Sequence, residues 1–386
     1  MAVAGAAAAP AAEAALPRVA LDHQRAIRDE PKVRARLRLP GYDGWAGVEL
    51  RGQSSQSFAK KSYAVELRER GGKNRDAALL GMPADDDWVL YAAYNDKSLM
   101  RNVVAYATAR RLGRWAADTR FVELVRNGRY EGVYVLMERP ELGADRVDVP
   151  GGGVTGDYLL EFTFPFQART KGARFLTPVK RRPIVYEDPE RADLSRREAS
   201  YIRGYVRRAE RALYSRRPTE WRRHIDAAAA VDYVLLQELF RNVDAFRGST
   251  FLTKGAGRKL VLGPVWDFDL AMGNSTFSTS RFVRGWWTRD RDWSERLWRD
   301  ATFRRALSRR WRALRRDGLR ADVLRAVDAH RAALRPHAGR NFRRWPVLRR
   351  RIFQNPAARG SWSAEVRFLR SWLSRRIAWI DRATRP

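Results

Sequence analysis

Short runs of alternating apolar and polar residues dominate the first half of the chain. Two strands joined by a turn rich in Pro, Gly and Asp are predicted by KVRARLRLPGYDGWAGVELRG, and a third by SYAVELR. The stretch TRFVELVRNGRYEGVYVLMERP alternates around Asn127-Gly128, a pair that favours a type I′ turn between strands. One more strand is predicted by GDYLLEFTF. The N-terminal half is therefore expected to be rich in strands.

Helical spacing appears once within that half and prevails after it. One helix is expected in YNDKSLMRNVVAYATARRLG, with Asn95 or Asp96 as its N-cap and Gly113 as its stop. Two more are expected near 192–215 and 219–240. A second hairpin, STFLTK and KLVLGPVW around Gly255-Ala256-Gly257, is expected to follow them.

From about residue 290 the pattern is helical again. The core candidates in this part are Trp298, Leu307, Trp311 and Leu314, and the last three follow helical i, i+4, i+7 spacing. A strand-rich N-terminal half followed by a helical C-terminal half predicts an α+β protein.

The N-terminus is low in complexity. It reads MAVAGAAAAPAAEAALP, without the positive charge that opens a secretion signal, and Pro10 and Glu13 interrupt its apolar run. A flexible tail is expected over residues 1–29. Since no apolar run is long enough for a membrane span, none is expected, and the protein is expected to be soluble.

The amino-acid composition limits the kinds of catalytic and metal site that the chain can form. The chain has no cysteine and only four histidines, which excludes disulfides, thiol catalysis and Cys-ligated zinc and disfavours a His-based zinc site. The net charge is +32, and residues 301–386 hold 24 Arg and 5 acidic residues, a net charge of +19. This basic region is expected either to bind an acidic or phosphorylated partner or to form a solvated helical surface. Nucleic acid is a weaker expectation, because no nucleic-acid motif occurs and the arginines interleave with apolar core positions.

The segment GPVWDFDLAMGN places two carboxylates inside an apolar run. Buried carboxylates are costly unless they are paired, hydrogen-bonded or bound to a metal. If this segment is extended, Asp267 and Asp269 point to the same face and converge, as a hard divalent cation requires. The alternative is that both acids only cap a turn.

A second candidate feature is the loop that begins RGQSSQS. Arg51, Ser54 and Ser55 offer positive charge, hydroxyls and free backbone N–H groups, which suit a phosphate, although a serine-rich hairpin loop is the simpler explanation. Lys60 and Lys61 open the next strand. Because neighbouring strand residues face opposite sides, only one of the two is expected to point into a site.

The third feature is Asp244, which follows the helix in LLQELFRNVDAF and lies 23 residues ahead of Asp267. Protein kinases have the same order of parts: phosphate loop, strand lysine, helix, catalytic-loop Asp, hairpin and metal-binding Asp. This chain keeps that order without GxGxxG, HRD or DFG motifs. Asn242 or Asn274 is a candidate for a further metal-ligating oxygen.

Several blocks of the sequence together resemble the CotH family, the spore coat protein H-type atypical protein kinases. These blocks are RGQSSQSFAKKSYAVEL, DWVLYAAYNDKSLMRN, FVELVRNGRYEGVYVLMER, RVDV, YLLEF, LLQELFRNVDAF and GPVWDFDLAMGN. The resemblance implies a divergent protein-kinase-like fold. It also implies transfer of the γ-phosphoryl group of ATP, with magnesium or manganese, to Ser or Thr of an acceptor protein or of the chain itself.

The resemblance also assigns roles to particular residues. Asp267 matches the metal-binding aspartate and Asp244 the catalytic-loop acid. Asp269, two residues from Asp267, is expected from its position to be the second metal ligand. The basic position falls on Lys60 or Lys61. Glu138 and Glu161 sit at strand ends in matching blocks, where each is expected either to pair with the lysine or help hold metal, or to form a structural salt bridge. Two departures, Gln53 for Asn and Ala59 for Pro, concern the shape of the phosphate loop.

The resemblance implies a kinase-like domain over residues 30–382. Its expected parts are a strand-rich nucleotide-binding lobe at 30–180, a helix with the catalytic and metal-binding segments at 190–290, and an Arg-rich helical region at 291–386. Two alternatives to a kinase are a catalytically inactive coat or surface binding protein on the same fold, and a nucleic-acid-binding protein. The compartment stays open between the cytoplasm and the spore or cell envelope.

Overall fold

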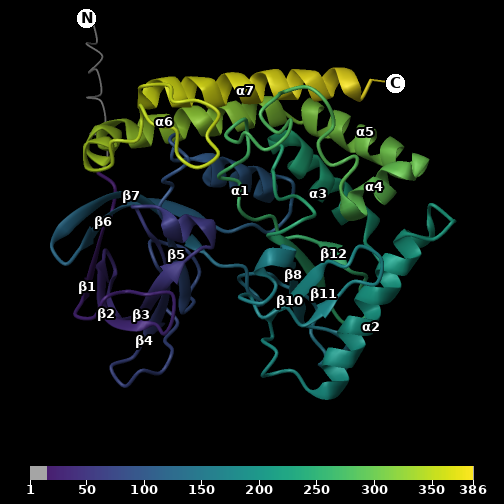
Figure 1. Ribbon diagram of the computed structural model, residues 1–386, viewed down its shortest axis with the longest axis horizontal. Helices are drawn as coiled ribbons and strands as arrows, with labels where there is room; N and C mark the ends of the chain where they lie inside the picture. The colour runs from purple at the N-terminus through teal and green to yellow at the C-terminus, as the bar shows by residue number, and fades with distance from the viewer. Residues whose placement is uncertain (1–14, 386) are drawn as a thin grey trace, which may run out of the picture.

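The computed structural model describes residues 15–385, and the strands between Arg18 and Glu138 form a closed barrel (Figure 1). Its strands follow one another around the barrel in the order β1-β2-β3-β4-β5-β7-β6. Their bounds are β1 Arg18–His23, β2 Val33–Leu39, β3 Tyr42–Arg51, β4 Ser62–Arg68, β5 Asp87–Tyr91, β6 Thr119–Arg126 and β7 Arg129–Glu138. The predicted hairpin at Asn127-Gly128 is confirmed, with φ values of +48° and +74° as a type I′ turn requires.

The barrel closes through β1, which pairs antiparallel with β2 and parallel with β6. The prediction of a flexible tail over 1–29 is therefore wrong for Arg18–His23, while residues 1–14 lie outside the described range. The alternation in this strand is short and follows an Ala/Pro-rich stretch. Its partner β6 lies about a hundred residues away along the chain, so the local pattern does not reveal the pairing.

Alternation along the strands fills the barrel with apolar side chains. In β2 the side chains of Ala35, Leu37 and Leu39 are buried, while those of Arg34 and Arg38, on the opposite face, are exposed. Val48 of β3 and Val65 of β4 join the same interior core. The barrel thus forms a hydrophobic core of its own, separate from the larger core that the helices share with the second sheet.

A second sheet has the strand order β12-β11-β8-β10-β9. Its strands are β8 Tyr158–Phe162, β9 Phe175–Leu176, β10 Pro183–Asp188, β11 Thr250–Lys254 and β12 Val261–Leu262. The expected strand-rich lobe at 30–180 does not correspond to one sheet, because β8 pairs with β11 and β10 rather than with the barrel. The strands change sheet after Glu138.

The helices are α1 Arg101–Arg111, α2 Arg196–Leu213, α3 Ala227–Phe240, α4 Asp292–Arg299, α5 Ala301–Arg316, α6 Leu319–Arg344 and α7 Trp362–Ala383. Four short 3-10 turns complete the elements: Ser54–Ser57, Gly153–Thr155, Pro165–Gln167 and Glu220–Arg223. Figure 1 shows α6 and α7 running side by side along one edge of the molecule, above both the barrel and the helices next to the second sheet. The α+β class is confirmed, whereas the closed barrel was not predicted.

The four core candidates of the C-terminal region, Trp298, Leu307, Trp311 and Leu314, are all buried in the larger core. Many arginines of this region serve internal ion pairs. Examples are Arg310 with Asp232, Arg315 with Asp381, Arg370 with Asp328 and the fully buried Arg376 with Glu238. Part of the basic charge is therefore neutralised within the fold.

None of the helices within residues 15–385 combines the length and apolarity that crossing a bilayer requires.

Candidate active site

Three aspartates from two separate segments form one electrostatic cluster. Asp244 lies in the turn after α3, and Asp267 and Asp269 follow β12. Burial raises the pKa of each carboxyl group, and the charges of the other aspartates raise it further for Asp244, to about 7, and for Asp269. The pKa of Asp267 is also raised by burial, against the opposing charge of Arg51 and hydrogen bonds with Asp269. The site concentrates negative charge that a cation would relieve.

The two carboxylates of the DFD segment converge for a reason other than the predicted one. Asp267 has φ +59°, in the left-handed region, so the segment is not an extended strand. Its carboxylate hydrogen-bonds with Asp269, which brings the two side chains together across a turn. The interaction between these two side chains therefore arises from a turn and not from the predicted strand alternation.

Side chains of helix α1 hydrogen-bond with the backbone of this turn. The Phe268 N–H donates to Asn102 Oδ1 at 2.7 Å, and the Asp267 N–H donates to the Tyr106 hydroxyl at 3.2 Å. The Tyr106 ring stacks on Trp266 with centroids 5.5 Å apart. The left-handed conformation is strained for a residue other than glycine. Asp267 keeps it because these contacts hold the turn in place.

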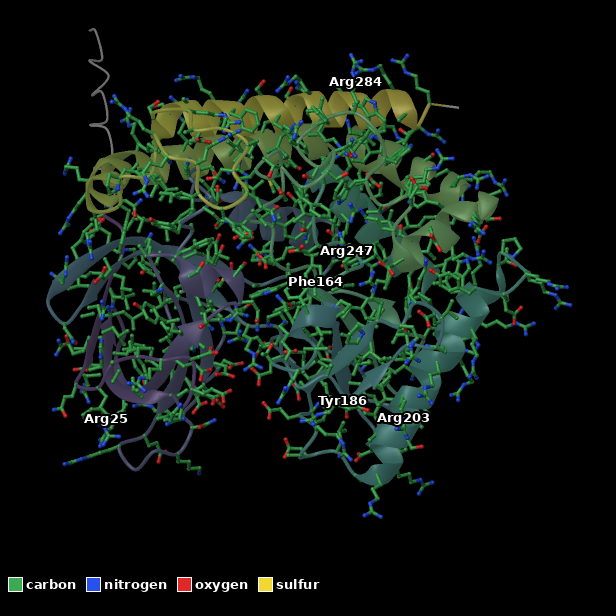
Figure 2. The ribbon with its side chains drawn as sticks, viewed as in Figure 1. Arg25, Phe164, Tyr186, Arg203, Arg247 and Arg284 are labelled. Atoms are coloured by element: carbon green, nitrogen blue, oxygen red, sulfur yellow. The ribbon has the colours of Figure 1, made fainter. Side chains whose placement is uncertain are left out.

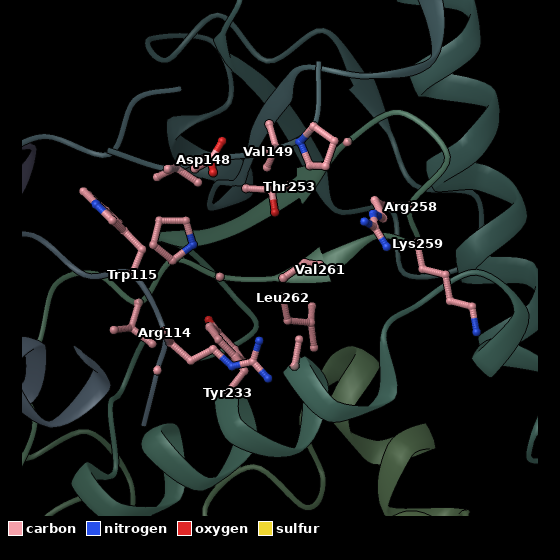
Figure 3. Close-up of a pocket in the computed structure, with 18 of the residues that line it drawn as sticks. Arg114, Trp115, Asp148, Val149, Tyr233, Thr253, Arg258, Lys259, Val261 and Leu262 are labelled. Atoms are coloured by element: carbon pink, nitrogen blue, oxygen red, sulfur yellow. The ribbon is translucent and has the colours of Figure 1, made fainter. Parts of the chain in front are cut away.

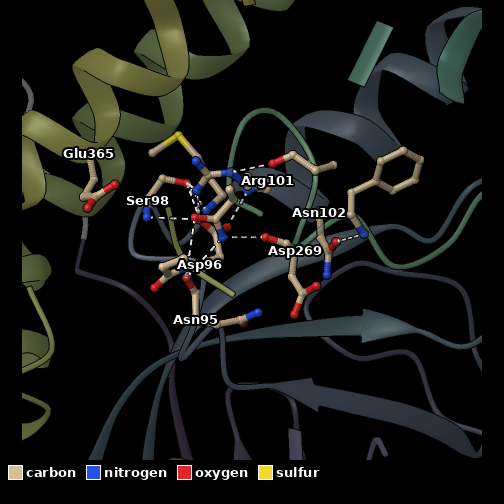
Figure 4. A network of polar contacts seen from close by, with 12 residues as sticks. Asn95, Asp96, Ser98, Arg101, Asn102, Asp269 and Glu365 are labelled. Carbon is tan, nitrogen blue, oxygen red and sulfur yellow. Dashed lines mark hydrogen bonds and ion pairs between the residues drawn. The ribbon is translucent and has the colours of Figure 1, made fainter. Parts of the chain in front are cut away.

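A buried polar network joins the start of α1 to the same turn (Figure 4). Asp96 forms an ion pair with Arg101 in which both side chains are almost fully buried. The Arg101 guanidinium also donates through Nε to Ala271 O at 3.2 Å, and the Asn95 side chain hydrogen-bonds with Asp269. The predicted N-cap is wrong, since α1 begins at Arg101. Asp96 nevertheless accepts the Arg101 N–H at 2.8 Å.

We expect Asn102→Ala to weaken the site without unfolding the protein. The variant leaves the Phe268 N–H buried without its acceptor, which costs about 1–3 kcal/mol of unfolding free energy. Metal-dependent nucleotide affinity should fall as Asp267 gains freedom. Urea unfolding and calorimetry measure the two effects. Asn74→Ala, at an exposed position whose side chain makes no hydrogen bond within residues 15–385, is the control. Equal effects of both variants would contradict the supporting role of Asn102.

Two basic side chains from different elements interact electrostatically with the aspartates. Arg51, at the end of β3, lies over the Trp266 ring at 5.1 Å, and its positive charge counteracts the raised pKa of Asp267. Lys171, from the loop after β8, exerts the same effect on both Asp244 and Asp267. Both positive charges therefore offset part of the negative charge of the aspartates.

Glu161 of β8 lies at the edge of this site. Its carboxylate accepts two hydrogen bonds from Lys171 Nζ, at 2.7 and 2.6 Å, and one from the Ser249 N–H at 3.1 Å. Burial raises the pKa of Glu161 to about 7, Lys171 opposes the rise, and Glu187 adds to it. Glu161 therefore positions Lys171.

Neither lysine of the predicted pair reaches the aspartates. Lys60 is buried, and its ammonium donates to Val133 O and to Asn341 Oδ1, the latter at 3.2 Å. Lys61 donates to Gln56 O at 2.6 Å, within its own loop. The expectation that one of them faces the phosphates is not met, because Lys60 instead joins β7 to α6.

We expect Lys60→Met to lower stability and leave nucleotide affinity unchanged. The variant removes the hydrogen bonds to Val133 O and Asn341 Oδ1, for a loss of about 1–3 kcal/mol in the free energy of unfolding. Lys61→Met, which removes a single bond within the loop, is the matched control and should be nearly silent. If Lys60→Met instead lowered nucleotide affinity at unchanged stability, Lys60 would have to contact the nucleotide.

The other predicted residues also have defined places. Ser54 and Ser55 lie in the 3-10 turn that follows Arg51, where Ser54 O accepts a hydrogen bond from Ser57 Oγ at 2.7 Å. Glu138 is buried and accepts the Asp118 N–H at 2.7 Å, with Arg146 3.9 Å away. Of the roles expected for Glu138, the structure thus favours a structural salt bridge over pairing with a lysine or holding a metal.

The donors at the cluster suit a hard cation. Only oxygens are present, and within residues 15–385 no group of three or more His, Asp or Glu side chains forms a ready-made metal site. Magnesium typically takes one or two carboxylates and completes its shell with water and substrate phosphates, so the pair Asp267 and Asp269 fits that group. The oxygens of Asn242 and Asn274 already accept hydrogen bonds, from the Asp244 N–H at 3.1 Å and from Asn355 at 3.1 Å.

Sequence reasoning missed Lys171 and the α1 residues that support the DFD turn. Asn102 and Tyr106 both lie in the helix that the sequence predicts, but nothing local links them to a segment far along the chain. Lys171 lies in a loop without a motif. Its role depends on how that loop folds over β8.

A cavity of about 260 Å³ lies next to the site but is not part of it (Figure 3). Its lining is mostly apolar and includes Trp115, Val149, Tyr233, Leu262 and Val265. None of the three aspartates lines it, although Val265 is close to Asp267 in the chain. The charged site and this apolar cavity are therefore separate features.

Comparison with known families agrees with the resemblance seen in the sequence. A family model described as CotH kinase protein matches residues 48–380. No curated protein matches the chain. The matched range includes Arg51, Glu161 and all three aspartates of the cluster.

Proposed function

The chain belongs to the CotH kinase protein family, and on that premise we propose that it is an ATP- and magnesium-dependent protein kinase. It transfers a γ-phosphoryl group to Ser or Thr of an acceptor protein or of itself, and manganese can replace magnesium. Phosphoryl transfer relies mainly on positioning and on neutralising charge, which this type of site can supply without a covalent intermediate.

One observation carries the proposal. Asp244, Asp267 and Asp269 form a single cluster although a hairpin separates Asp244 from the other two. A protein that needed the fold only for packing would gain nothing from three mutually repelling carboxylates, because each raises the cost of ionising the others.

Each residue has a definite task in this proposal. Asp267 and Asp269 hold the metal ion, which when bound neutralises charge on the phosphate oxygens. Arg51 and Lys171 bind phosphate oxygens from two sides of the cluster. Asp244, with a pKa raised to about 7, orients the acceptor hydroxyl and accepts its proton.

A catalytically inactive coat or surface binding protein is the second candidate. It is favoured by the position of Lys60 and Lys61, since neither supplies the strand lysine that kinases place on the phosphates. Arg51 and Lys171 supply positive charge at the cluster instead, and the three aspartates are all retained. The kinase proposal therefore accounts for more of the site.

Incubation of the purified chain with labelled ATP distinguishes the two candidates. With magnesium or manganese present, label should enter serine or threonine of the chain or of an added acceptor, and chelation of the metal should stop this. Metal-dependent nucleotide binding without any transfer would support the inactive binding protein.

A further inference from the structure

Two arginines near Asp244 form no ion pair within residues 15–385. Arg247 lies in the turn that Asp244 opens, where its N–H donates to Asp244 O at 2.8 Å. Within residues 15–385 its guanidinium makes no hydrogen bond or ion pair. Arg291, just before α4, donates only to Trp287 O, at 3.0 Å. Unlike the ion-paired arginines of the C-terminal helices, these two keep most of their N–H donors free.

Aromatic rings hold both guanidinium groups in place. Both lie near the Phe277 ring, whose centroid is 5.1 Å from the Arg247 guanidinium and 5.8 Å from that of Arg291. Arg291 stacks on Trp287 at 3.6 Å, and the Trp287 indole donates to Asn242 O. Arg247 also lies over Phe164 at 5.8 Å, near the middle of the molecule (Figure 2). Stacking orients a guanidinium without using its hydrogen-bond donors.

Holding these two charges together has a cost. Burial and then the charge of Arg247 lower the pKa of Arg291 to about 10, although the charges of Glu238 and Asp292 oppose the shift. No carboxylate lies within ion-pair distance of either side chain in the described part of the chain. A bound anion would remove the repulsion and use the free donors, since two guanidinium forks match a carboxylate or a phosphate.

The position of the pair indicates where that anion comes from. Arg247 lies in the same turn as Asp244 and donates its backbone N–H to Asp244 O. The charges of Arg247 and Arg291 lower the pKa of Asp244, whereas the charge of Arg51 lowers the pKa of Asp267. In the proposed reaction Asp244 contacts the acceptor hydroxyl, so the pair lies on the acceptor side. Phe277 is 36% exposed there, and Phe166, which stacks on Phe164, is 79% exposed, so a peptide can approach.

We propose that Arg247 and Arg291 form a specificity subsite for an anionic side chain of the acceptor protein, a carboxylate or a phosphate near the acceptor hydroxyl. This inference rests on the proposed kinase function for its orientation, because Asp244 defines the acceptor side. The subsite itself is a binding property that can be measured without any transfer. The acceptor class is thus a protein whose Ser or Thr lies close to acidic or phosphorylated residues.

Binding of short fluorescent serine peptides to the full-length chain tests the subsite. The peptides carry Asp, phosphoserine or, as the neutral reference, Asn at each position beside the serine in turn. We expect the chain to prefer the best acidic peptide over its Asn counterpart by about tenfold, and Arg247→Ala to abolish that preference. Arg247→Lys, which keeps the charge, should restore part of it. Comparison of the Asp and phosphoserine peptides identifies which anion is preferred.

Two controls complete the test. Arg289→Ala removes an exposed arginine of the same segment that makes no contact within residues 15–385, and it should leave the preference unchanged. Calorimetry of nucleotide binding should give the same affinity for the wild type and Arg247→Ala. Equal binding of acidic and neutral peptides would overturn the subsite. So would a loss of nucleotide affinity in Arg247→Ala as large as its loss of peptide affinity, because the pair would then bind nucleotide.

The failure of the kinase proposal would look different. If the chain transfers phosphate to no acceptor yet binds acidic peptides in an Arg247-dependent way, the subsite stands as part of a binding protein. If transfer occurs at equal rates on acidic and neutral peptides, the result supports the kinase proposal and contradicts the proposed subsite.

Discussion

Asp267→Asn should abolish metal-dependent nucleotide binding and, with it, phosphoryl transfer. The substitution removes a charged oxygen from the pair that would hold the cation, and magnesium is bound through few protein ligands, so the loss of one is severe. We expect the loss of transfer to be on the order of a hundredfold or more, since metal and positioning both depend on this side chain. Calorimetry of nucleotide binding with and without magnesium gives the result directly.

The same variant should fold at least as well as the wild type. Asn adopts the left-handed conformation as readily as Asp, so φ +59° is kept without new strain. The negative charge that raises the pKa values of Asp244 and Asp269 is also removed. Thermal unfolding therefore separates a lost ligand from a lost fold. Asp290→Asn, at an exposed position without contacts in the described range, is the matched control. Unchanged metal-dependent binding in Asp267→Asn would reduce the DFD segment to a turn.

Asp244→Asn should separate transfer from binding. Asp244 is proposed to act on the acceptor hydroxyl, a role that begins only when nucleotide is already bound. Nucleotide affinity with magnesium should therefore stay close to that of the wild type. Transfer should fall on the order of a hundredfold or more, because Asn cannot accept the proton. Rates of label transfer, compared with calorimetry on the same sample, measure both effects.

The opposite pattern would change the assignment. If Asp244→Asn loses nucleotide binding as Asp267→Asn does, the three aspartates act as one metal cluster. Asp290→Asn again controls for general charge effects.

The local pattern of the sequence was enough to find most elements and the carboxylates. Strand alternation located the β2–β3 and β6–β7 hairpins, and helical spacing located Trp311 and Leu314 in the core, because these patterns depend on neighbours along the chain. The apolar surroundings of Asp267 and Asp269 identified them as candidates because buried carboxylates need a reason.

Only the tertiary structure decided how those parts meet. Closure of the barrel depends on β1 pairing with β6, and the division of the sheets depends on β8 pairing with β11; both pairings join distant segments. The left-handed Asp267 is held by Asn102 and Tyr106 from another helix.

The lysines illustrate the same limit. Strand alternation required Lys60 and Lys61 to face opposite ways, but it did not say what lay on either side. In the fold Lys60 meets Asn341 of α6, while Lys171 and Arg51 supply the charge at the aspartates. The sequence by itself therefore identified the candidate acids, because it places them in an apolar run. Which cations accompany those acids was decided by contacts between residues far apart in the chain, which no local pattern encodes.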